Sequence, residues 1–294
     1  MVRLIDKEIR VQYMLPHKLH EELERLPLIF IPLAPLEWHG LHLAIGTDPI
    51  NAEHVALEVA KRVGGVVLPT LYMGTERERD PKTLENLGFD KSDYVVGMNF
   101  FKAKGLYESF YFSEEIFALV LRAHIELCIN HGYRYIYIVS GHGAVNHNNV
   151  IERLCIEFNN KDRTKGIKVG TVATKVAFGI SFPIPKEKAK IGGITHAGIE
   201  ETSLMMYYGD KLGGDKLGGD KLVDLNQLPS IEEKLDYTTY GIVDGGAFLG
   251  NPADGHVIPE NLDPRVHSSK DLGKKIFENT IKVLTNDVRK VFNL

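Results

Sequence analysis

Short apolar runs alternate with amphipathic helical patterns along most of this chain, and this alternation restricts the fold more than any other feature. Residues 28–33 form an apolar run of strand length, and residues 51–63 follow with apolar side chains recurring on one helical face. The pattern continues with expected strands at 66–69, 135–139 and 167–178, and expected helices at 113–130, about 150–159 and 276–291.

This order of elements predicts an α/β fold with a mostly parallel sheet covered by helices on both faces. A helix that follows a strand brings the next strand back parallel to the first. Clusters of polar residues come directly after the predicted strands. Because open α/β sheets place ligands at the carboxyl ends of their strands, we expect the functional site there.

Three segments interrupt the alternation, and none has the composition of a linker between domains. Residues 74–112 form a long connection rich in aromatic and arginine side chains. We interpret it as a lid-like insertion, because loops of this length usually carry function or subunit contacts. Residues 209–222 repeat Gly-Asp-Lys-Leu-Gly with a period too short for a solenoid, so an exposed loop is expected. Residues 240–259 are rich in glycine and proline. We therefore expect a single domain over residues 1–294.

The composition excludes several classes of protein. With 44% hydrophobic and 25% charged residues, the chain can bury an ordinary core. A net charge of −4 provides no basic surface for nucleic acid, and the apolar runs are too short to cross a membrane. The first residues also lack the apolar run of a signal peptide. Cys128 and Cys155 fall inside helical patterns, so we expect buried thiols in a reducing cytoplasm.

The first cluster of chemistry-bearing residues contains Glu37 and His39, with Asp48 on the loop that follows. In extended backbone, residues two apart point to the same side, so Glu37 and His39 can approach one ligand together. Mixed carboxylate and imidazole donors suit zinc, manganese or iron(II) better than calcium, which prefers oxygen ligands. The structural alternative is that Glu37 caps the next helix and His39 packs in the core.

A second cluster follows the expected strand at 135–139. His142 lies between two glycines, which allow the backbone to approach a ligand closely. The alternative is a strand-to-helix turn in which Asn148 or Asn149 caps the helix. His147 is expected at the surface or behind the site.

The third cluster begins at His196, which precedes Glu201 by five residues. The two side chains could form an acid–base pair, or Glu201 could reach a metal. The alternative is a helix start, where carboxylates complement the positive end of the helix dipole. The spacing alone leaves these possibilities open.

Together, and in this order, the three clusters resemble the creatininase (creatinine amidohydrolase) family. Members carry a Glu-x-His-Gly…His-Leu-Pro-x-Gly-Thr-Asp run, then Asn-Gly-His-Gly-Gly-Asn, then His-Ala-Gly-Glu-x-Glu-Thr-Ser. This chain has Glu-Trp-His-Gly-Leu-His-Leu-Ala-Ile-Gly-Thr-Asp at 37–48, Ser-Gly-His-Gly-Ala-Val-Asn at 140–146 and His-Ala-Gly-Ile-Glu-Glu-Thr-Ser at 196–203. Gly-Asn-Pro at 250–252 is similar to a later Gly-Asp-Pro element. The resemblance covers about residues 28–255.

The resemblance implies a three-layer α/β/α fold with two divalent metals bridged by an aspartate. Carried over position by position, the ligands are Glu37, His142 and the bridging Asp48 for one metal, and Asp48 and His39 for the other. Creatininase itself supplies a further glutamate two residues after the histidine, where this chain has Ala144. Glu201 is the candidate replacement. The expected cofactor is therefore one or two divalent ions per chain, of zinc, manganese or iron.

The function that the resemblance implies is metal-dependent hydrolysis of a small cyclic substrate. The metals lower the pKa of water towards ~7 and polarise the carbonyl under attack, while His196, steadied by Glu201 if that residue is not a ligand, moves a proton to the leaving group. A cyclic amide C–N bond is the favoured target, and C–C cleavage of a cyclic polyol diketone is the alternative. A non-catalytic protein that binds metal or a small molecule is an alternative of another class. Trp38, Arg77 and Arg79 are the candidate substrate-binding residues, and a homo-oligomer, hexameric by resemblance, is expected.

Overall fold

The computed structural model describes residues 7–100, 108–160, 168–171, 195–212 and 222–294. Its main sheet has five strands in the order β2-β1-β4-β5, with β3 paired to β1, and every pairing is parallel. The strands are β1 (Leu28–Ala34), β2 (Val66–Val67), β3 (Leu71–Tyr72), β4 (Tyr135–Ser140) and β5 (Lys168–Thr171). The expectation of a mostly parallel sheet is confirmed.

The central strand β1 is buried along its whole length. Its side chains alternate between two separate hydrophobic clusters, with Phe30 on one side of the sheet and Ile31 on the other. Tyr137 and Ile138 of the neighbouring β4 divide in the same way. A strand covered on both faces needs a continuous apolar run rather than an alternating one, which explains the composition of this segment.

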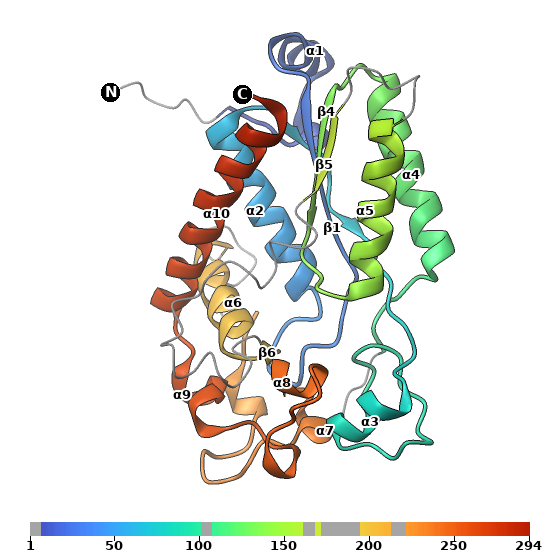
Figure 1. The fold of residues 1–294 in the computed structure, drawn as a ribbon. Helices are drawn as coiled ribbons and strands as arrows, with labels where there is room; N and C mark the ends of the chain where they lie inside the picture. Colours follow the sequence, from blue (N-terminus) through green and yellow to red (C-terminus); the bar gives the residue numbers. More distant parts are fainter. Residues whose placement is uncertain (1–6, 101–107, 161–167, 172–194, 213–221) are drawn as a thin grey trace.

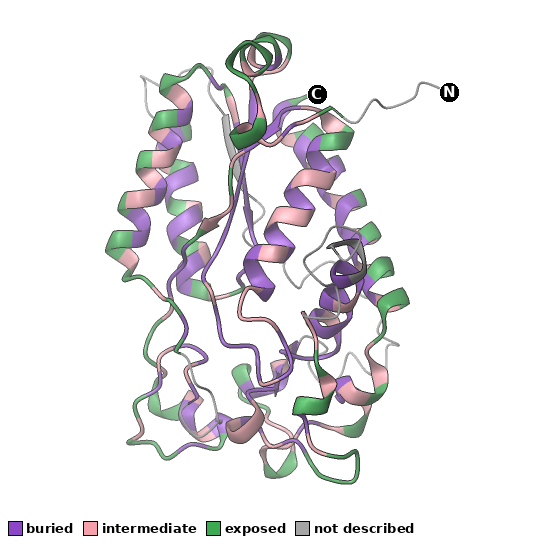
Figure 2. Cartoon of the chain, turned by 180° about the vertical axis from the view of Figure 1, so that it is seen from behind, coloured by how far each residue is buried: buried purple, intermediate pink, exposed green. Residues whose placement is uncertain are grey.

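One face of the sheet is covered by α2 (Thr47–Val63) and α10 (Lys270–Phe292), and α6 (Ile199–Leu212) packs against both of these helices (Figure 1). Helix α2 packs directly on β1, and α10 contacts both α2 and α6. Helix α10 buries Ile281, Leu284 and Val288, whose spacing places them on one helical stripe. Figure 2 shows the same division in space, with buried residues turned inward and exposed residues on the outer sides of the helices.

The opposite face is covered by α4 (Glu114–Asn130) and α5 (Val145–Asn160) (Figure 1). Ser113 caps α4 by accepting a hydrogen bond from the main-chain N–H of Ile116. Cys128 and Cys155 are buried in these two helices as free thiols, and burial raises the pKa of each to about 12. Helices on both sides of the sheet give the three-layer α/β/α architecture.

Shorter elements surround the two ends of the sheet. They are η1 (Val11–Tyr13), α1 (Pro16–Arg25), α3 (Pro81–Leu87), the antiparallel pair β6 (Thr195–His196) and β7 (Val243–Asp244), η5 (Leu225–Gln227), α7 (Tyr237–Tyr240), α8 (Gly245–Phe248), η6 (Asp254–His256), η7 (Glu260–Leu262) and α9 (Pro264–His267). In Figure 1, α1 lies at one end of the molecule, and α3, α7 and α8 lie at the other, where β1 ends. None of the helices in the described part of the chain combines the length and apolar character needed to span a bilayer.

Several boundaries differ from the sequence prediction. Helix α2 begins at Thr47 rather than at residue 51, and α5 begins at Val145 rather than near residue 150. Asn148 and Asn149 therefore lie inside α5 and do not cap it. The 74–112 connection holds a helix, α3, which Asp80 caps. The expected strand at 167–178 is described only as β5, and its remainder lies outside the described residues. The 209–222 repeat begins inside α6, and its residues 213–221 also lie outside them.

Candidate metal centre

The three clusters predicted from the sequence meet at the carboxyl end of the sheet. Strand β1 leads into the loop that carries Glu37 and His39, and β4 leads into the loop of His142. Five residues at this point are each no more than 3% exposed: Glu37, His39, Asp48, His142 and Glu201. Burying so many charged and titratable groups is costly unless they are paired or hold a metal, so their convergence indicates a site rather than ordinary packing.

Gly141 brings the loop after β4 against the first turn of α2. A Cβ atom at Gly141 would lie 2.0 Å from the main-chain oxygen of Asp48, so any side chain would push the two segments apart. The glycine does allow a close backbone approach, but to Asp48 rather than to a ligand. This contact sets Asp48 beside His142.

Asp48 presents one carboxylate oxygen to each of two histidines. Its Oδ1 lies 3.2 Å from Nε2 of His39, and its Oδ2 lies 3.1 Å from Nδ1 of His142. Glu37 completes the second group, because its Oε2 lies 3.2 Å from the same Nδ1 of His142. A carboxylate that faces two donor groups in this way has the arrangement of a ligand shared by two metals.

Glu201 reaches the His39 side of the centre from the first turn of α6. Its Oε1 lies 3.5 Å from Nε2 of His39, and its Oε2 accepts a hydrogen bond of 2.5 Å from the main-chain N–H of Ala197. One oxygen of Glu201 thus bonds the backbone just before α6, and the other faces the centre. Glu37 does not cap α2, whose N-cap residue is Gly46.

Two donor sets that share Asp48 fit divalent metal ions. The first is Glu37, Asp48 and His142, and the second is His39, Asp48 and Glu201; within each set the ligand atoms lie within 4.8 Å of one another. Carboxylate oxygens with one imidazole nitrogen per set suit zinc or manganese. Among the described residues, the buried Nε2 of His39 makes no well-aligned hydrogen bond, although Oδ1 of Asp48 lies 3.2 Å away, and this fits a nitrogen that holds a metal.

The carboxylates and imidazoles of the centre shift one another's pKa values strongly. Burial lowers the pKa of His39, but the charges of Glu201 and Asp48 outweigh it and hold that pKa well above the ordinary value. The pKa of His142 is raised in the same way, against burial, by Glu37 and Asp48. Burial raises the pKa of Glu37, yet the facing imidazoles, His142 first, bring it well below the ordinary value. Without metal, the centre is thus a cluster of carboxylates and protonated imidazoles.

His196 lies beside the centre in a fixed orientation. Its Nε2 donates a hydrogen bond of 2.8 Å to the main-chain oxygen of Trp38, which leaves the lone pair on Nδ1. The ring lies 4.4 Å from that of His39, centroid to centroid. Burial and the neighbouring charge of His39 lower the pKa of His196, so the imidazole is neutral at pH 7. The bond that orients His196 therefore comes from Trp38 and not from Glu201.

A further layer of hydrogen bonds holds the His142 loop, and the sequence did not reveal it. The main-chain N–H of Thr75 donates to Nδ1 of His147 at 3.4 Å, so the imidazole proton of His147 is on Nε2. That nitrogen donates to Oγ of Ser140 at 3.0 Å, and Ser140 bonds the main chain of His142. Of the two positions expected for His147, the one behind the site is confirmed and the surface is wrong, because the residue is fully buried. Its position on the same apolar face of α5 as Val150 was the available signal.

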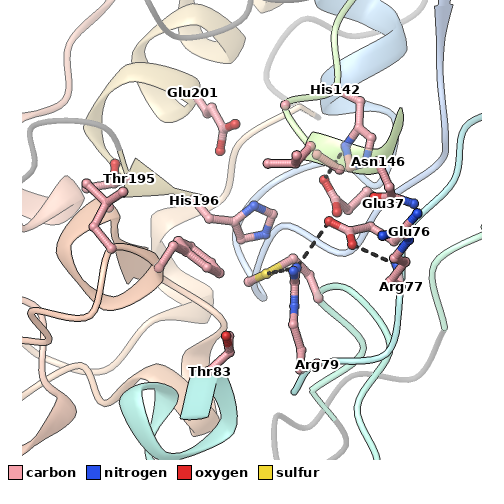
Figure 3. A pocket seen from close by; sticks show the side chains of 17 residues that line it. Glu37, Glu76, Arg77, Arg79, Thr83, His142, Asn146, Thr195, His196 and Glu201 are labelled. Atoms are coloured by element: carbon pink, nitrogen blue, oxygen red, sulfur yellow. Dashed lines mark hydrogen bonds and ion pairs between the residues drawn. The ribbon is translucent and has the colours of Figure 1, made fainter. Parts of the chain in front are cut away.

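A cavity of about 650 Å³ opens onto the centre. Figure 3 shows His196, Glu201, Glu37 and His142 along one part of its wall, and Arg79 with Glu76 along another. The cavity thus brings the donor groups and a polar wall within reach of the same bound molecule.

The two predicted arginines line this cavity, whereas Trp38 is not among its lining residues. Nη2 of Arg79 lies 3.1 Å from Oε1 of Glu76, and Arg77 pairs with Glu114 on α4. The Arg79 guanidinium also lies 5.5 Å from the ring centroid of Phe248. Trp38 packs in the hydrophobic core and acts on the site through its main chain.

Fold and donor groups together place the protein among the α/β proteins that can hold metal ions at the carboxyl edge of a parallel sheet. Comparison with known proteins gives the family. The family described as Creatininase (creatinine amidohydrolase) matches residues 12–85 and 94–286, and this chain belongs to it. Its members are metal-dependent hydrolases, so family and donor set agree.

Solved structures of creatininases share this fold. A creatinine amidohydrolase (creatininase) matches with a TM-score of 0.63 and 19% identity over 97% of this chain and 98% of that one. A manganese form of creatininase matches with a TM-score of 0.59 and 18% identity over 97% and 99% of the two chains. A Zn–Zn form of a creatininase variant matches with a TM-score of 0.60 and 19% identity over 97% of this chain and 99% of that one. No curated protein matches the sequence.

Proposed function

We propose that this protein is a hydrolase with two metal sites, which acts on a carbonyl carbon of a small cyclic substrate. A cyclic amide C–N bond is the favoured target, because the family is described as creatinine amidohydrolase. The observation that carries the proposal is the orientation of Asp48, whose two oxygens face His39 and His142 in separate donor sets.

When bound, two divalent ions at these donors supply a water of lowered pKa and a polarised carbonyl. The chain's own contribution is the handling of protons. His196 is held as the neutral tautomer with its lone pair on Nδ1 and lines the cavity, so it can accept a proton there and return it to a leaving nitrogen. Its fixed bond to Trp38 keeps the other ring nitrogen out of this exchange.

A second candidate reaction is C–C hydrolysis in a cyclic polyol diketone. The polar wall of the cavity favours it, because Arg79 presents donors and Glu76 an acceptor beside the apolar ring of Phe248. Hydroxyl and carbonyl groups of an oxygenated ring would be bound by such a pair. Both reactions begin with addition to an activated carbonyl, so the same centre can serve either.

Incubation of the metal-loaded protein with creatinine, with formamides and with cyclic polyol diketones distinguishes these reactions by their products. Replacing His39 or Asp48 with alanine should abolish turnover and lower metal content, whereas the exposed His20→Ala should change neither. Full activity in the His39→Ala variant would contradict the proposal. A tightly bound metal without turnover of any of the three substrate classes would instead support a non-catalytic binding protein.

We also propose a homo-oligomer, hexameric by the resemblance, that works in the cytoplasm. The aromatic 74–112 connection is the candidate contact, with Phe110 and Phe112 exposed on it. Light scattering of the purified chain measures the assembly, and a monomer at micromolar concentration would refute it.

A further inference from the structure

Tyr111 connects the 74–112 segment to the metal centre through its hydroxyl group. The hydroxyl donates a hydrogen bond of 2.5 Å to Oε1 of Glu37 and accepts one of 3.2 Å from the main-chain N–H of Met98. A main-chain nitrogen can only donate, so the direction of both bonds is fixed. With Oε1 occupied, Glu37 turns Oε2 towards His142.

The Tyr111 ring is held firmly in place. Gly97 has a φ of +55°, and a Cβ atom there would lie 2.7 Å from the phenol carbons and oxygen, so the ring rests directly on backbone. On either side of Tyr111, the main-chain N–H groups of Phe110 and Phe112 donate bonds of 2.8 Å to the carbonyl oxygens of Leu36 and Gly74. The hydroxyl cannot leave Glu37 without disturbing this packing.

The backbone that supports Tyr111 also supports the cavity wall. The carbonyl oxygen of Gly97 accepts a hydrogen bond of 3.0 Å from Nε of Arg79. The main-chain N–H of Gly97 donates a hydrogen bond of 3.0 Å to the carbonyl oxygen of Arg77. Both arginines and Met98 line the cavity. One side chain therefore touches a candidate metal ligand on one side and the backbone of the cavity wall on the other.

We propose that Tyr111 is a positioning residue that orients Glu37 for its metal and couples metal loading to the order of the cavity wall at residues 77–98. The inference rests on the proposed metal centre. Without the hydroxyl, the Glu37 carboxylate can rotate, and the ion held by Glu37, Asp48 and His142 loses a fixed ligand. Conversely, an ion that fixes Glu37 also fixes the hydroxyl of Tyr111 and the N–H of Met98.

Zinc titration of the metal-free protein tests the positioning role. Tyr111→Phe keeps the ring on Gly97 and removes only the hydroxyl, and Tyr94→Phe is the matched control because Tyr94 is 64% exposed on the same connection. Adding Glu201→Gln to each protein isolates the site of Glu37, Asp48 and His142. We expect Tyr111→Phe to lower the Zn²⁺ affinity of that site about tenfold or more, and Tyr94→Phe to leave it unchanged.

Hydrogen exchange at the Met98 N–H tests the coupling. In the unaltered protein, Zn²⁺ should slow this exchange about tenfold, and in Tyr111→Phe it should not. A purely structural role would lower the melting temperature but keep the effect of Zn²⁺ on exchange. Equal affinity and equal Zn²⁺-dependent protection in both proteins would overturn this inference while the metal centre stands. Failure of the unaltered protein to bind Zn²⁺ would overturn the proposed function as well.

Discussion

Oε1 of Glu201 lies 3.5 Å from Nε2 of His39 at the carboxyl end of the sheet. The resemblance to creatininase implies a metal-binding carboxylate two residues after the histidine, where this chain has Ala144. Glu201 comes from the start of α6 and meets His39 together with Asp48. We therefore predict that Glu201 completes the second donor set from a different element of the fold.

Replacing His196 separates proton transfer from metal binding. His196 also lies close enough to Glu37 and His39 to form a third donor set, but its Nε2 is committed to Trp38. We expect His196→Gln to keep the full metal content and to lower kcat by roughly 10²–10⁴-fold. Elemental analysis and turnover of the same sample check this. Loss of one ion per chain would show that His196 is a ligand.

Metal uptake should release protons. Carboxylates hold the pKa values of His39 and His142 well above the ordinary value, so both imidazoles carry a proton in the metal-free protein at pH 7. Metal ligation requires the neutral imidazole, and binding therefore expels about two protons and weakens as the pH falls. Calorimetric titration in buffers of different ionisation enthalpy measures the number. A heat of binding independent of the buffer would contradict the expectation.

Gly141 should tolerate no side chain. An alanine Cβ would lie 2.0 Å from the main-chain oxygen of Asp48, which forces the His142 loop away from the first turn of α2. We expect Gly141→Ala to lower the free energy of unfolding by about 3 kcal/mol and to reduce metal content. Gly46→Ala is the control, because its Cβ would meet its nearest neighbour at an ordinary 3.5 Å. Urea denaturation checks both variants, and equal stability of the two would refute the packing argument.

Glu22 should make stability depend on acid pH. Hydrogen bonds from Arg25 lower the pKa of Glu22, and a hydrogen bond from Lys7 lowers it further. Burial acts in the opposite direction, but the pKa stays below its ordinary value of 4.5. The unfolded chain then binds the proton more readily than the folded one. The stabilisation is therefore complete above about pH 4.5 and is lost as the pH falls through the lowered pKa of the folded state. Glu22 is 2% exposed, but the side chains of Lys7 and Arg25 are 49% and 52% exposed, so solvent screens part of the pairing.

The free energy of unfolding, measured in urea at pH 7 and pH 3, checks this dependence. The unaltered protein should lose more stability between the two values than Glu22→Gln does. Glu24→Gln, on the same helix with a side chain 70% exposed, should behave like the unaltered protein. If Glu22→Gln loses as much free energy of unfolding between pH 7 and pH 3 as the unaltered protein does, the role given to Glu22 is wrong.

Local patterns predicted the strands β1, β2, β4 and β5 and the helices α2, α4, α5 and α10, but not β3 or α1. The strand β1 is a continuous apolar run, and α4 begins behind a serine cap, so both could be placed from neighbouring residues alone. Helix α3 was missed because seven residues are too few for a clear apolar period. The available signal was Asp80, which caps the helix, followed by Pro81, a favourable first residue. The early starts of α2 and α5 were missed because polar residues occupy their first turns.

The candidate donors could be named from the sequence because carboxylates and imidazoles followed predicted strands. The structure brings all five together, and their binding of metal stays a prediction. Tyr111 could not be connected to Glu37 in advance, since 74 residues separate them and no periodicity joins them. The same holds for the main-chain support that Trp38 gives His196, which depends on long-range packing. Contacts of this kind follow from the whole fold rather than from a motif.

Elemental analysis of the protein, after reconstitution with zinc and removal of excess metal, tests the central claim most directly. The unaltered chain should hold about two ions, and Glu201→Gln should hold about one, because the His39 set loses a ligand. Glu200→Gln is the matched control. Burial raises the pKa of Glu200 to about 7, and its carboxylate accepts a hydrogen bond from the Thr195 hydroxyl rather than facing the metal centre. It should keep both ions. A single ion in the unaltered chain, or two ions in Glu201→Gln, would contradict a second site completed by Glu201.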